Sequence, residues 1–250
     1  MSVLFLFLLS LINLIAYSIG DTIETPKKGV VILFKMKFNK IQFTTYLLGC
    51  LLFSIGAKFF IDSHLGTDPL DVMVIGIVQH IGLTIGIVSG IISIFFLAIW
   101  SLWNKKIPPI SPFITMFLIG SLIDIWNVLK IENLTAPYLS PFVLLVVAII
   151  LAAYGSSLII MSGIGIRIMD LIAITMVEKL KWHFFYAKML LEIFFVVTGV
   201  LLSGPLGIGT FAFLFFVSPG IVLFMSANEK YLHLINYGLK KPTYQTVQTK

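Results

Sequence analysis

The sequence predicts an all-α, polytopic membrane protein made of two tandem copies of one unit, and three observations support this. First, 59% of the 250 residues are apolar, only 11% are charged and the mean hydropathy is +1.06, whereas about a quarter of the residues in a soluble domain are charged. Second, apolar runs of about 20 residues, the length of a helix that crosses a bilayer, recur along the chain. Third, an acidic, Gly-containing break at residues 65–71 recurs 99 positions later, at residues 164–170.

The two breaks define the repeat. Shifted by 99 positions, the copies align without a gap at Gly56 with Gly155, Ser63 with Ser162, Gly66 with Gly165 and Asp71 with Asp170. Paired breaks at corresponding positions of two membrane halves indicate the binding site of a transporter. The core of the chain is therefore predicted to be a duplication with a site between its two halves.

Composition and motifs exclude several classes of protein. Cys50 is the only cysteine, so an intrachain disulfide and a Cys-based metal cluster are excluded. The four histidines lack a metal-ligand spacing, and the sequence has no nucleotide-binding glycine loop and no nucleophile elbow. We therefore expect no metal, no cofactor and no enzymatic activity. The formal net charge of +6 is interpreted as lysines gathered in cytoplasmic loops, not as a surface for nucleic acid.

The two ends of the chain differ from its core. Residues 1–41 are expected to form an apolar helix and a basic loop. The apolar run at residues 3–19 has no positive charge before it, which favours an extra helix over a cleaved signal peptide. The membrane domain then covers residues 42–227. A polar cytoplasmic tail follows at residues 228–250, and it is expected to be dispensable for folding because it has few apolar groups to bury.

Each copy is expected to contain three full spans and one short helix directly after its break. The short helix has about 12 residues, too few to cross the hydrocarbon core, so we interpret it as a re-entrant half-helix. The first copy, residues 43–130, has spans at 43–62, 84–103 and 110–129 and its short helix at 70–81. The second copy, residues 139–226, has spans at 139–161, at 186–203 and up to 226, and its short helix at 168–180.

The number of spans decides the topology. Three spans per copy is an odd number, so two such copies lie upside down relative to one another. This inverted arrangement places every Lys and Arg on the cytoplasmic side except Lys58 and Lys130. If the short helices cross instead, the repeats are parallel and the residues outside are Lys58, Lys105, Lys106 and Arg167. The charge bias therefore favours inverted repeats with a cytoplasmic C-terminus.

The aspartates of the breaks have two interpretations. Asp68 fits the N-cap of the short helix, with Pro69 as its first residue and Asp71 placed to bond back to the cap. Asp170, however, recurs at the position aligned with Asp71, while Arg167 replaces the cap. Ionisable groups at membrane depth are expensive to bury and usually face a cavity or a partner. Asp71 and Asp170 are therefore candidate carriers of an ion or a proton, and helix capping is the alternative.

Three further charged residues are candidates for a binding site. Arg167 aligns with Asp68 and would pair with an aspartate across the two-fold axis, unless it lies at the cytoplasmic surface as an orientation charge. Lys188 and Glu192 are spaced i, i+4 within one predicted span, where an ion pair lowers the cost of burying each charge. That pair is either structural or takes part in ion movement. The helix breaks themselves are assigned to Gly66, Pro69 and Gly165.

A resemblance to a known family becomes visible at these residues. The run G-x₉-G-T-D-P-L-D at residues 56–71, followed by Gly76 and a glycine-rich span, resembles the YczE/YitT group of bacterial integral membrane proteins. The similarity extends over about residues 43–226. It implies a location in the bacterial cytoplasmic membrane, it supplies no catalytic residues, and it implies little about activity. The sequence lacks the soluble C-terminal domain of the YitT branch, so it is more similar to YczE.

Two functional hypotheses follow from the residues. The first is a small-solute secondary transporter or permease with its site between the two breaks. The second is a non-transporting membrane scaffold or accessory protein. Breaks that converge beside a cavity favour transport, whereas breaks capped at the surface of a packed interior favour the scaffold. The expected partners are the lipid bilayer and an unidentified small solute or ion, with a homo-oligomer left open and nucleic acid excluded.

Overall fold

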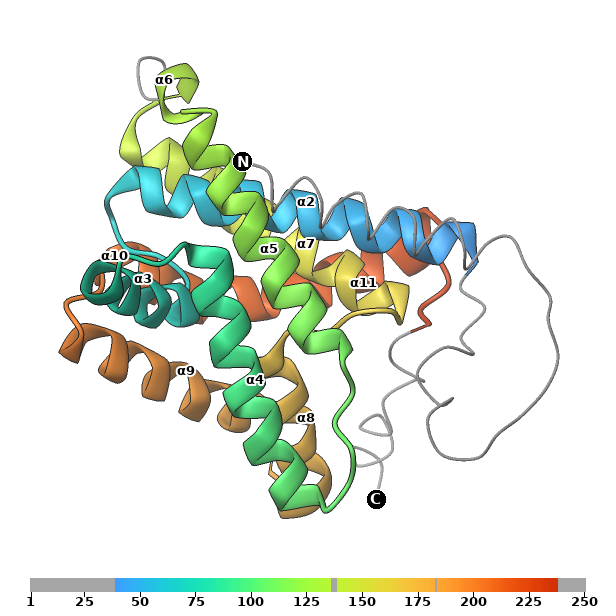
Figure 1. The fold of residues 1–250 in the computed structure, drawn as a ribbon. Coiled ribbons are helices and arrows are strands. Elements are labelled where there is room, and N and C mark those ends of the chain that lie inside the picture. The colour runs from blue at the N-terminus through green and yellow to red at the C-terminus, as the bar shows by residue number, and fades with distance from the viewer. Residues whose placement is uncertain (1–38, 136–138, 183, 238–250) are drawn as a thin grey trace, which may run out of the picture. The chain divides into compact units, whose positions relative to one another are not determined.

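The computed structural model describes residues 39–135, 139–182 and 184–237 (Figure 1). All described residues belong to one compact unit. The predicted N-terminal apolar helix and residues 238–250 of the predicted tail lie outside the described residues. Within the described ranges every regular element is a helix, as the sequence predicts.

Five helical segments of the described chain are long and apolar enough to cross a membrane. They are α2 (Lys40–Ser63), α4 (Ile85–Asn104), α5 (Ser111–Val128), α7 (Pro141–Ser162) and the continuous segment Ile208–Tyr231. The other helices are the short α3 (Pro69–Ile81), α6 (Glu132–Thr135) and α8 (Ile168–Leu180), and the longer α9 (Phe184–Leu201). The chain is thus a multi-pass membrane protein, and α9 occupies the range expected for the remaining span.

The short helices α3 and α8 occupy aligned positions. Each has 13 residues, and a shift of 99 positions superposes both the first and the last residue of α3 on those of α8. The serines before the two breaks also make the same hydrogen bonds. Ser63 Oγ donates to Phe60 O (2.7 Å) and accepts from Leu65 N (3.2 Å), and Ser162 Oγ donates to Ile159 O (2.6 Å) and accepts from Ile164 N (3.2 Å).

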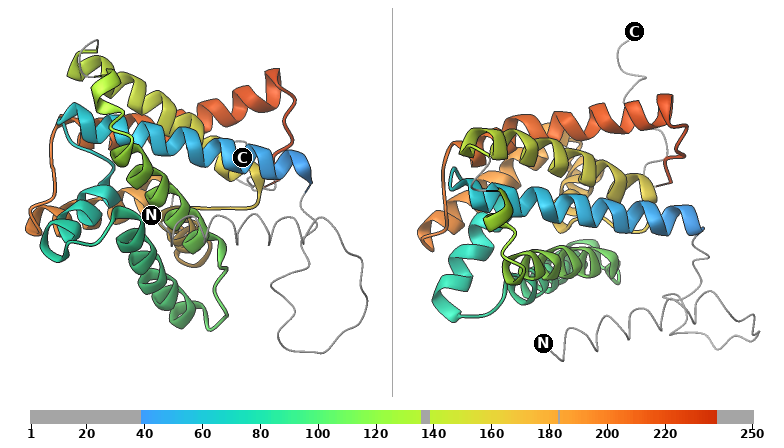
Figure 2. Two further views of the ribbon diagram at one scale, coloured as in Figure 1. Left: turned by 45° about the horizontal axis from the view of Figure 1, so that its top comes forward. Right: turned by 90° about the horizontal axis from the view of Figure 1, so that it is seen from above.

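The helices α2 and α7 pack side by side and run antiparallel (Figures 1 and 2). Their glycines permit this close contact. A Cβ on Gly56 would lie 2.8 Å from the backbone nitrogen of Ala152, and one on Gly155 would lie 2.5 Å from that of Phe53. Shifting either contact by 99 positions turns it into the other, because Phe53 aligns with Ala152. Such reciprocal contacts are those of two elements related by a two-fold axis.

The position of α4 is determined by α5. The carboxylate of Asp124 accepts the backbone N–H groups of Ile85 (3.0 Å) and Gly86 (2.9 Å), which are free donors at the start of α4. A Cβ on Gly86 would lie 2.8 Å from the Ser121 hydroxyl oxygen, so the two helices touch there. This contact places the next turn of α4, with the buried Ser89, towards the interior.

The last membrane segment contains a π-helical turn. It consists of α10 (Ile208–Ala212), the π turn (Phe213–Val217) and α11 (Ser218–Tyr231). Pro219 cannot donate a regular helical hydrogen bond, and the wider turn directly before it lets the helix continue. The structure carries α11 past the expected end near Ser226 to Tyr231, and Asn228 is buried.

The chain after α11 turns back onto α7. The backbone N–H of Leu234 donates to the carbonyl oxygen of Asn228 (3.2 Å), and that of Tyr237 donates to the carbonyl oxygen of Met161 (2.9 Å). Gly163 has φ +68°, and a Cβ there would lie 2.9 Å from the Tyr237 side chain. The first residues of the predicted polar tail are therefore docked beside the second break.

Candidate functional site

The second copy holds the first break in place. Gly66 has φ +110°, a conformation that favours glycine, and a Cβ there would lie 2.7 Å from the Thr210 hydroxyl oxygen. The backbone N–H of Thr67 donates to that hydroxyl (3.1 Å), and the N–H of Gly209 donates to the carbonyl oxygen of Leu65 (2.6 Å). Gly66 thus permits a turn that is bonded directly to the start of α10.

The first copy holds the second break in a similar way. A Cβ on Gly165 would overlap the ring of Tyr46 and would lie 2.5 Å from the Thr115 hydroxyl oxygen. Those two side chains share a hydrogen bond of 3.0 Å, and they come from α2 and α5. Each break therefore packs against helices of the other copy, and glycine is needed at both places because no side chain fits.

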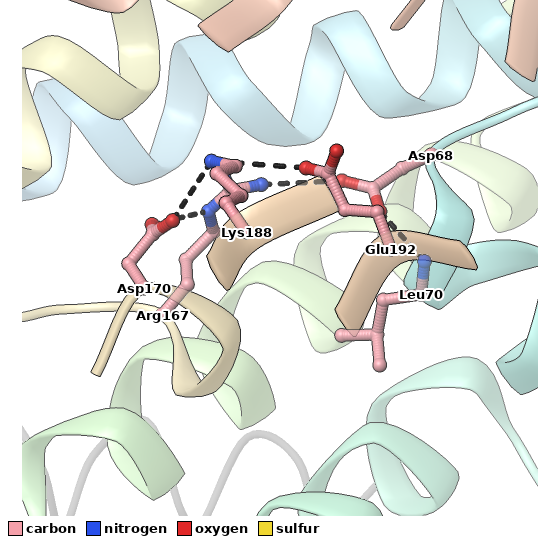
Figure 3. Close-up of polar contacts among 6 residues, drawn as sticks. All are labelled: Asp68, Leu70, Arg167, Asp170, Lys188 and Glu192. Carbon is pink, nitrogen blue, oxygen red and sulfur yellow. Dashed lines mark hydrogen bonds and ion pairs between the residues drawn. The ribbon is translucent and has the colours of Figure 1, made fainter. Parts of the chain in front are cut away.

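The two breaks meet at Asp68 and Arg167 (Figure 3). Asp68 is the N-cap of α3, and its Oδ1 accepts the backbone N–H of Leu70 (2.8 Å), while Pro69 takes the first helical position as predicted. Its Oδ2 lies 3.1 Å from Nη1 of Arg167. Residues 68 and 167 are also aligned positions of the two copies. The contact therefore joins corresponding positions of the two breaks.

Asp170 continues the contacts into α8 and α9. Its Oδ2 lies 3.2 Å from Nε of Arg167, and its Oδ1 lies 2.9 Å from Nζ of Lys188. Nζ of Lys188 lies 3.8 Å from Oε1 of Glu192, one turn further along α9. The ion network, as we call Asp68, Arg167, Asp170, Lys188 and Glu192, therefore joins both breaks to α9 (Figure 3).

All five side chains of the ion network are almost completely buried. Arg167 is 2% exposed, so its interpretation as an orientation charge at the cytoplasmic surface is wrong. The predicted pairing with an aspartate of the other copy is the arrangement found. The guanidinium carbon of Arg167 also lies 4.7 Å from the ring centroid of Phe53, a cation–π contact. Buried charges are tolerated only where partners compensate for lost water, so each member of the network depends on the others.

Asp71 lies beside the ion network rather than within it. Its side chain lines a cavity of ≈ 10 Å³, about the size of one water molecule, together with Asp68, Arg167 and Ser89. Within the described chain, Oδ2 of Asp71 and Nη2 of Arg167 are buried without a hydrogen-bond partner. The return bond from Asp71 to the cap, which the sequence predicts, is therefore not made by Oδ2. A free acceptor and a free donor instead border the same cavity.

The sequence prediction missed two buried serines of α4, of which Ser89 lines the cavity. Ser89 and Ser93 of α4 are both buried, at 2% and 0% exposure. They align with Lys188 and Glu192 when the copies are shifted by 99 positions. Comparing the two copies beyond the breaks would have found them. Each copy thus contributes polar side chains at four corresponding positions, one of which is Asp71 and its counterpart Asp170. Only the second copy has charges on the helix that follows its short helix.

A second group of ion pairs lies away from this site. Nζ of Lys58 on α2 is 2.6 Å from Oδ1 of Asp62 and 3.1 Å from Oε2 of Glu132 on α6. The side chain of Glu132 is 38% exposed, and its pKa lies below the ordinary glutamate value because the carboxylate accepts hydrogen bonds from its own backbone N–H and from Lys58. This group ties α6 to the end of α2 that precedes the first break.

Comparisons with known proteins identify relatives of unknown activity. A family model described as "Family of unknown function (DUF6198)" matches residues 40–226. The "Uncharacterized membrane protein YczE" of Bacillus subtilis (strain 168) is 28% identical over 206 residues, 81% of this chain and 93% of that protein. The "Uncharacterized protein YyaS" of the same organism is 27% identical over 175 residues, 68% of this chain and 85% of that protein. No solved structure matches the chain.

Proposed function

We propose a function for this chain from its geometry, because the activity of its family is unknown. The chain belongs to the family of unknown function DUF6198. It is similar to YczE, as the motif at residues 56–71 predicts. The proposed function is secondary transport of a small polar solute, with the binding site between the two breaks. The observation that carries it is the buried ion network, in which Arg167 of one break contacts Asp68 of the other.

The packing of α2 and α7 supports an inverted repeat. The two helices occupy aligned positions in the two copies, both are long enough to cross a membrane, and they run antiparallel. Two membrane-crossing helices that are copies of one another and antiparallel belong to units of opposite orientation. The axis between such units lies in the membrane plane, which is the arrangement of many secondary transporters. Together with the lysine distribution, this arrangement supports a cytoplasmic C-terminus.

The convergence of the breaks favours transport over a scaffold. A purely structural interior gains nothing from six buried charged side chains at one place, because apolar residues of the same volume are often as stabilising. A transporter, in contrast, needs polar groups at the interface between two halves that move. The Arg167–Asp68 contact is a bond between those halves, and the cavity beside it is too small for a solute in this closed conformation.

The chemistry of the site indicates the class of solute. Arg167 and Lys188 supply donors, while four carboxyl groups and the Ser89 hydroxyl supply acceptors, so a solute that offers both donors and acceptors would be bound. Opening of the halves would have to enlarge the cavity before such a solute could enter. Alternating exposure of the site to the two sides of the membrane follows if the two copies rock about the axis near Asp68 and Arg167.

The test is ligand-dependent stabilisation of the purified full-length protein across a panel of small polar metabolites. A ligand at about 100 times its Kd stabilises the folded state by about 2.7 kcal/mol, which is readily measured as a rise in Tm. The stabilising compound should then be taken up by proteoliposomes that contain the wild-type protein. Asp68→Asn should abolish both effects.

Glu132→Gln is the matched control, because that side chain is partly exposed and lies outside the site. It should retain both the rise in Tm and the uptake. If no compound in the panel raises Tm, the transport proposal fails and the scaffold hypothesis takes its place. If uptake persists unchanged in Asp68→Asn, the proposed binding site between the breaks is wrong.

A further inference from the structure

The charges at the candidate site do not balance. Arg167 and Lys188 carry the positive charges, and four carboxyl groups lie with them: Asp68, Asp71, Asp170 and Glu192. All six residues are at most 6% exposed. With every carboxyl group ionised, the cluster would hold two negative charges without a compensating partner among the described residues. Buried, uncompensated charge is strongly unfavourable, so two further positive charges must be bound there.

Two of the four carboxylates have both oxygens satisfied. Asp170 binds Arg167 through Oδ2 and Lys188 through Oδ1, at 3.2 and 2.9 Å. Asp68 accepts the N–H of Leu70 at one oxygen and Arg167 at the other, at 2.8 and 3.1 Å. Hydrogen bonds and opposite charges at this distance favour the ionised form of a carboxyl group. The two positive charges of the cluster are therefore committed to Asp68 and Asp170.

The other two carboxyl groups lack such partners. Oδ2 of Asp71 has no hydrogen-bond partner among the described residues, and neither has Oε1 of Glu192. Oε1 of Glu192 lies 3.8 Å from Nζ of Lys188, beyond hydrogen-bonding distance. The nearest contact of that lysine within the network is Asp170 instead. The number of under-partnered carboxyl groups thus equals the number of missing positive charges.

We propose that this site binds two protons, one on Asp71 and one on Glu192, and that these are the coupling ions of the transport proposed above. The coupling role of the protons rests on that proposed function, whereas their binding to Asp71 and Glu192 does not. The charged groups that face Asp71 are Asp68 and Arg167.

The surroundings of Glu192 differ from those of Asp71. Glu192 is faced by Lys188 on its own helix and by Asp68, Arg167 and Asp170 from the two breaks. Four of the residues that line the cavity beside Asp71 come from α5, and none of them is titratable: Met116, Ile119, Gly120 and Ile123. The proton on Asp71 therefore meets no competing acid or base on the α5 side of the cavity.

The geometry favours protons over metal cations at Asp71. The cavity has room for about one water molecule, and the guanidinium of Arg167 lines the same space, so a metal ion there would meet a positive charge. A protonated carboxyl group needs only an acceptor for its O–H, and the Ser89 hydroxyl or a water molecule supplies one. Release breaks the carboxyl O–H bond, passes the proton to water and leaves the carboxylate behind, so no further reactant is needed.

Deprotonation of Asp71 would act on the contact between the two breaks. The new carboxylate would lie next to Nη2 of Arg167, which has no hydrogen-bond partner among the described residues. It would then compete with Asp68 for the guanidinium. Since the Arg167–Asp68 contact joins the two halves, the protonation of Asp71 would determine how firmly the halves are held together.

The direct test is infrared spectroscopy of the full-length protein in lipid at neutral pH, where the C=O stretch of a protonated carboxyl group is separate from that of a carboxylate. The wild-type protein should show protonated carboxyl absorption. Asp71→Asn and Glu192→Gln should each remove a part of it, and the double variant should remove all of it. Glu132→Gln is the matched control, because that side chain lies outside the site, and it should retain both contributions.

A pH titration of the wild-type absorption keeps the test decisive if a variant fails to fold. The absorption should disappear as the pH is raised above neutral. If it is absent at neutral pH, if it survives in the double variant, or if Na⁺ or K⁺ stabilises the protein at constant pH while no such absorption exists, the proposal is overturned.

The measurement requires no solute, so it separates the two proposals. Protonated carboxyl groups without binding of any solute would leave the proton sites standing and remove the transport function. Solute uptake without protonated carboxyl groups would leave the transport function standing and remove the proton sites.

Discussion

Asp68 shows how a single side chain can be both a helix cap and part of a site. One oxygen caps α3 through Leu70, and the other binds Arg167 of the second copy. Capping and function were alternatives for this residue on the basis of the sequence. The structure makes both contacts at once, because a carboxylate has two oxygens that point to different partners. The position of α3 and the contact between the two breaks are therefore coupled through one residue.

The coupling between Asp68 and Arg167 is measurable by a double-mutant cycle. Arg167→Gln leaves the charge of Asp68 without its partner and that of Asp170 with Lys188 alone. Removal of one member of a buried pair costs about 3–5 kcal/mol. Asp68→Asn removes one of these charges, so the double variant should lose less than the sum of the single variants, by about 1–3 kcal/mol. The free energy of unfolding in detergent is the measurement. Additive losses would show that the contact contributes nothing to the folded state.

At the scale of elements, the chain at and after the end of α11 is docked, although its polar composition predicts a dispensable tail. Residues 228–237 are part of a polar sequence, yet Asn228 is buried and the segment returns to α7 near the second break. A cavity of ≈ 120 Å³ lies between this segment, the start of α2 and the end of α7. Few apolar groups are needed for such docking, because backbone hydrogen bonds to the free carbonyl groups at a helix end supply the contact.

We expect truncation after Lys230 to destabilise the protein, contrary to the expectation from composition. It removes the bond from Tyr237 to Met161 and the packing of Tyr237 on Gly163. A hydrogen bond contributes about 1 kcal/mol, and each kcal/mol lowers Tm by about 2–4 °C in a protein of this size. The control is truncation after Tyr237, which removes no described contact. Equal Tm values for the two truncated proteins would show that the docked segment is dispensable.

At the scale of the whole membrane domain, the contact between α2 and α7 supports the inverted repeat proposed above. Their contacts are reciprocal under a shift of 99 positions, and the helices are antiparallel. The first and last residues of α3 correspond to those of α8 under the same shift of 99 positions. The serine hydrogen bonds before the two breaks correspond in the same way. An arrangement in which the short helices re-enter the membrane, and the copies are inverted, agrees with all of these observations.

Cysteine labelling at two lysines distinguishes inverted from parallel repeats. In the inverted arrangement Lys105 lies inside and Lys130 outside, whereas crossing short helices would exchange the two. Lys105→Cys should therefore react with an impermeant maleimide only after the membrane is opened, and Lys130→Cys should react in intact cells. The native Cys50 is completely buried and should remain unlabelled. The opposite pattern would make the repeats parallel.

Hydropathy, break spacing and local capping patterns are read along the chain, and they were enough to predict the membrane class, the two short helices and all six charged candidates for the site. Which charges pair depends on distances between residues far apart in sequence. Arg167 is the clearest case: its local sequence suits a surface charge equally well, and only the approach of the two breaks brings Asp68 within 3.1 Å of it. The same holds for Ser89 and for Tyr237, whose roles arise from packing against α5 and α7. Local sequence determines where helices start and stop, whereas the tertiary structure decides which buried polar groups can compensate one another.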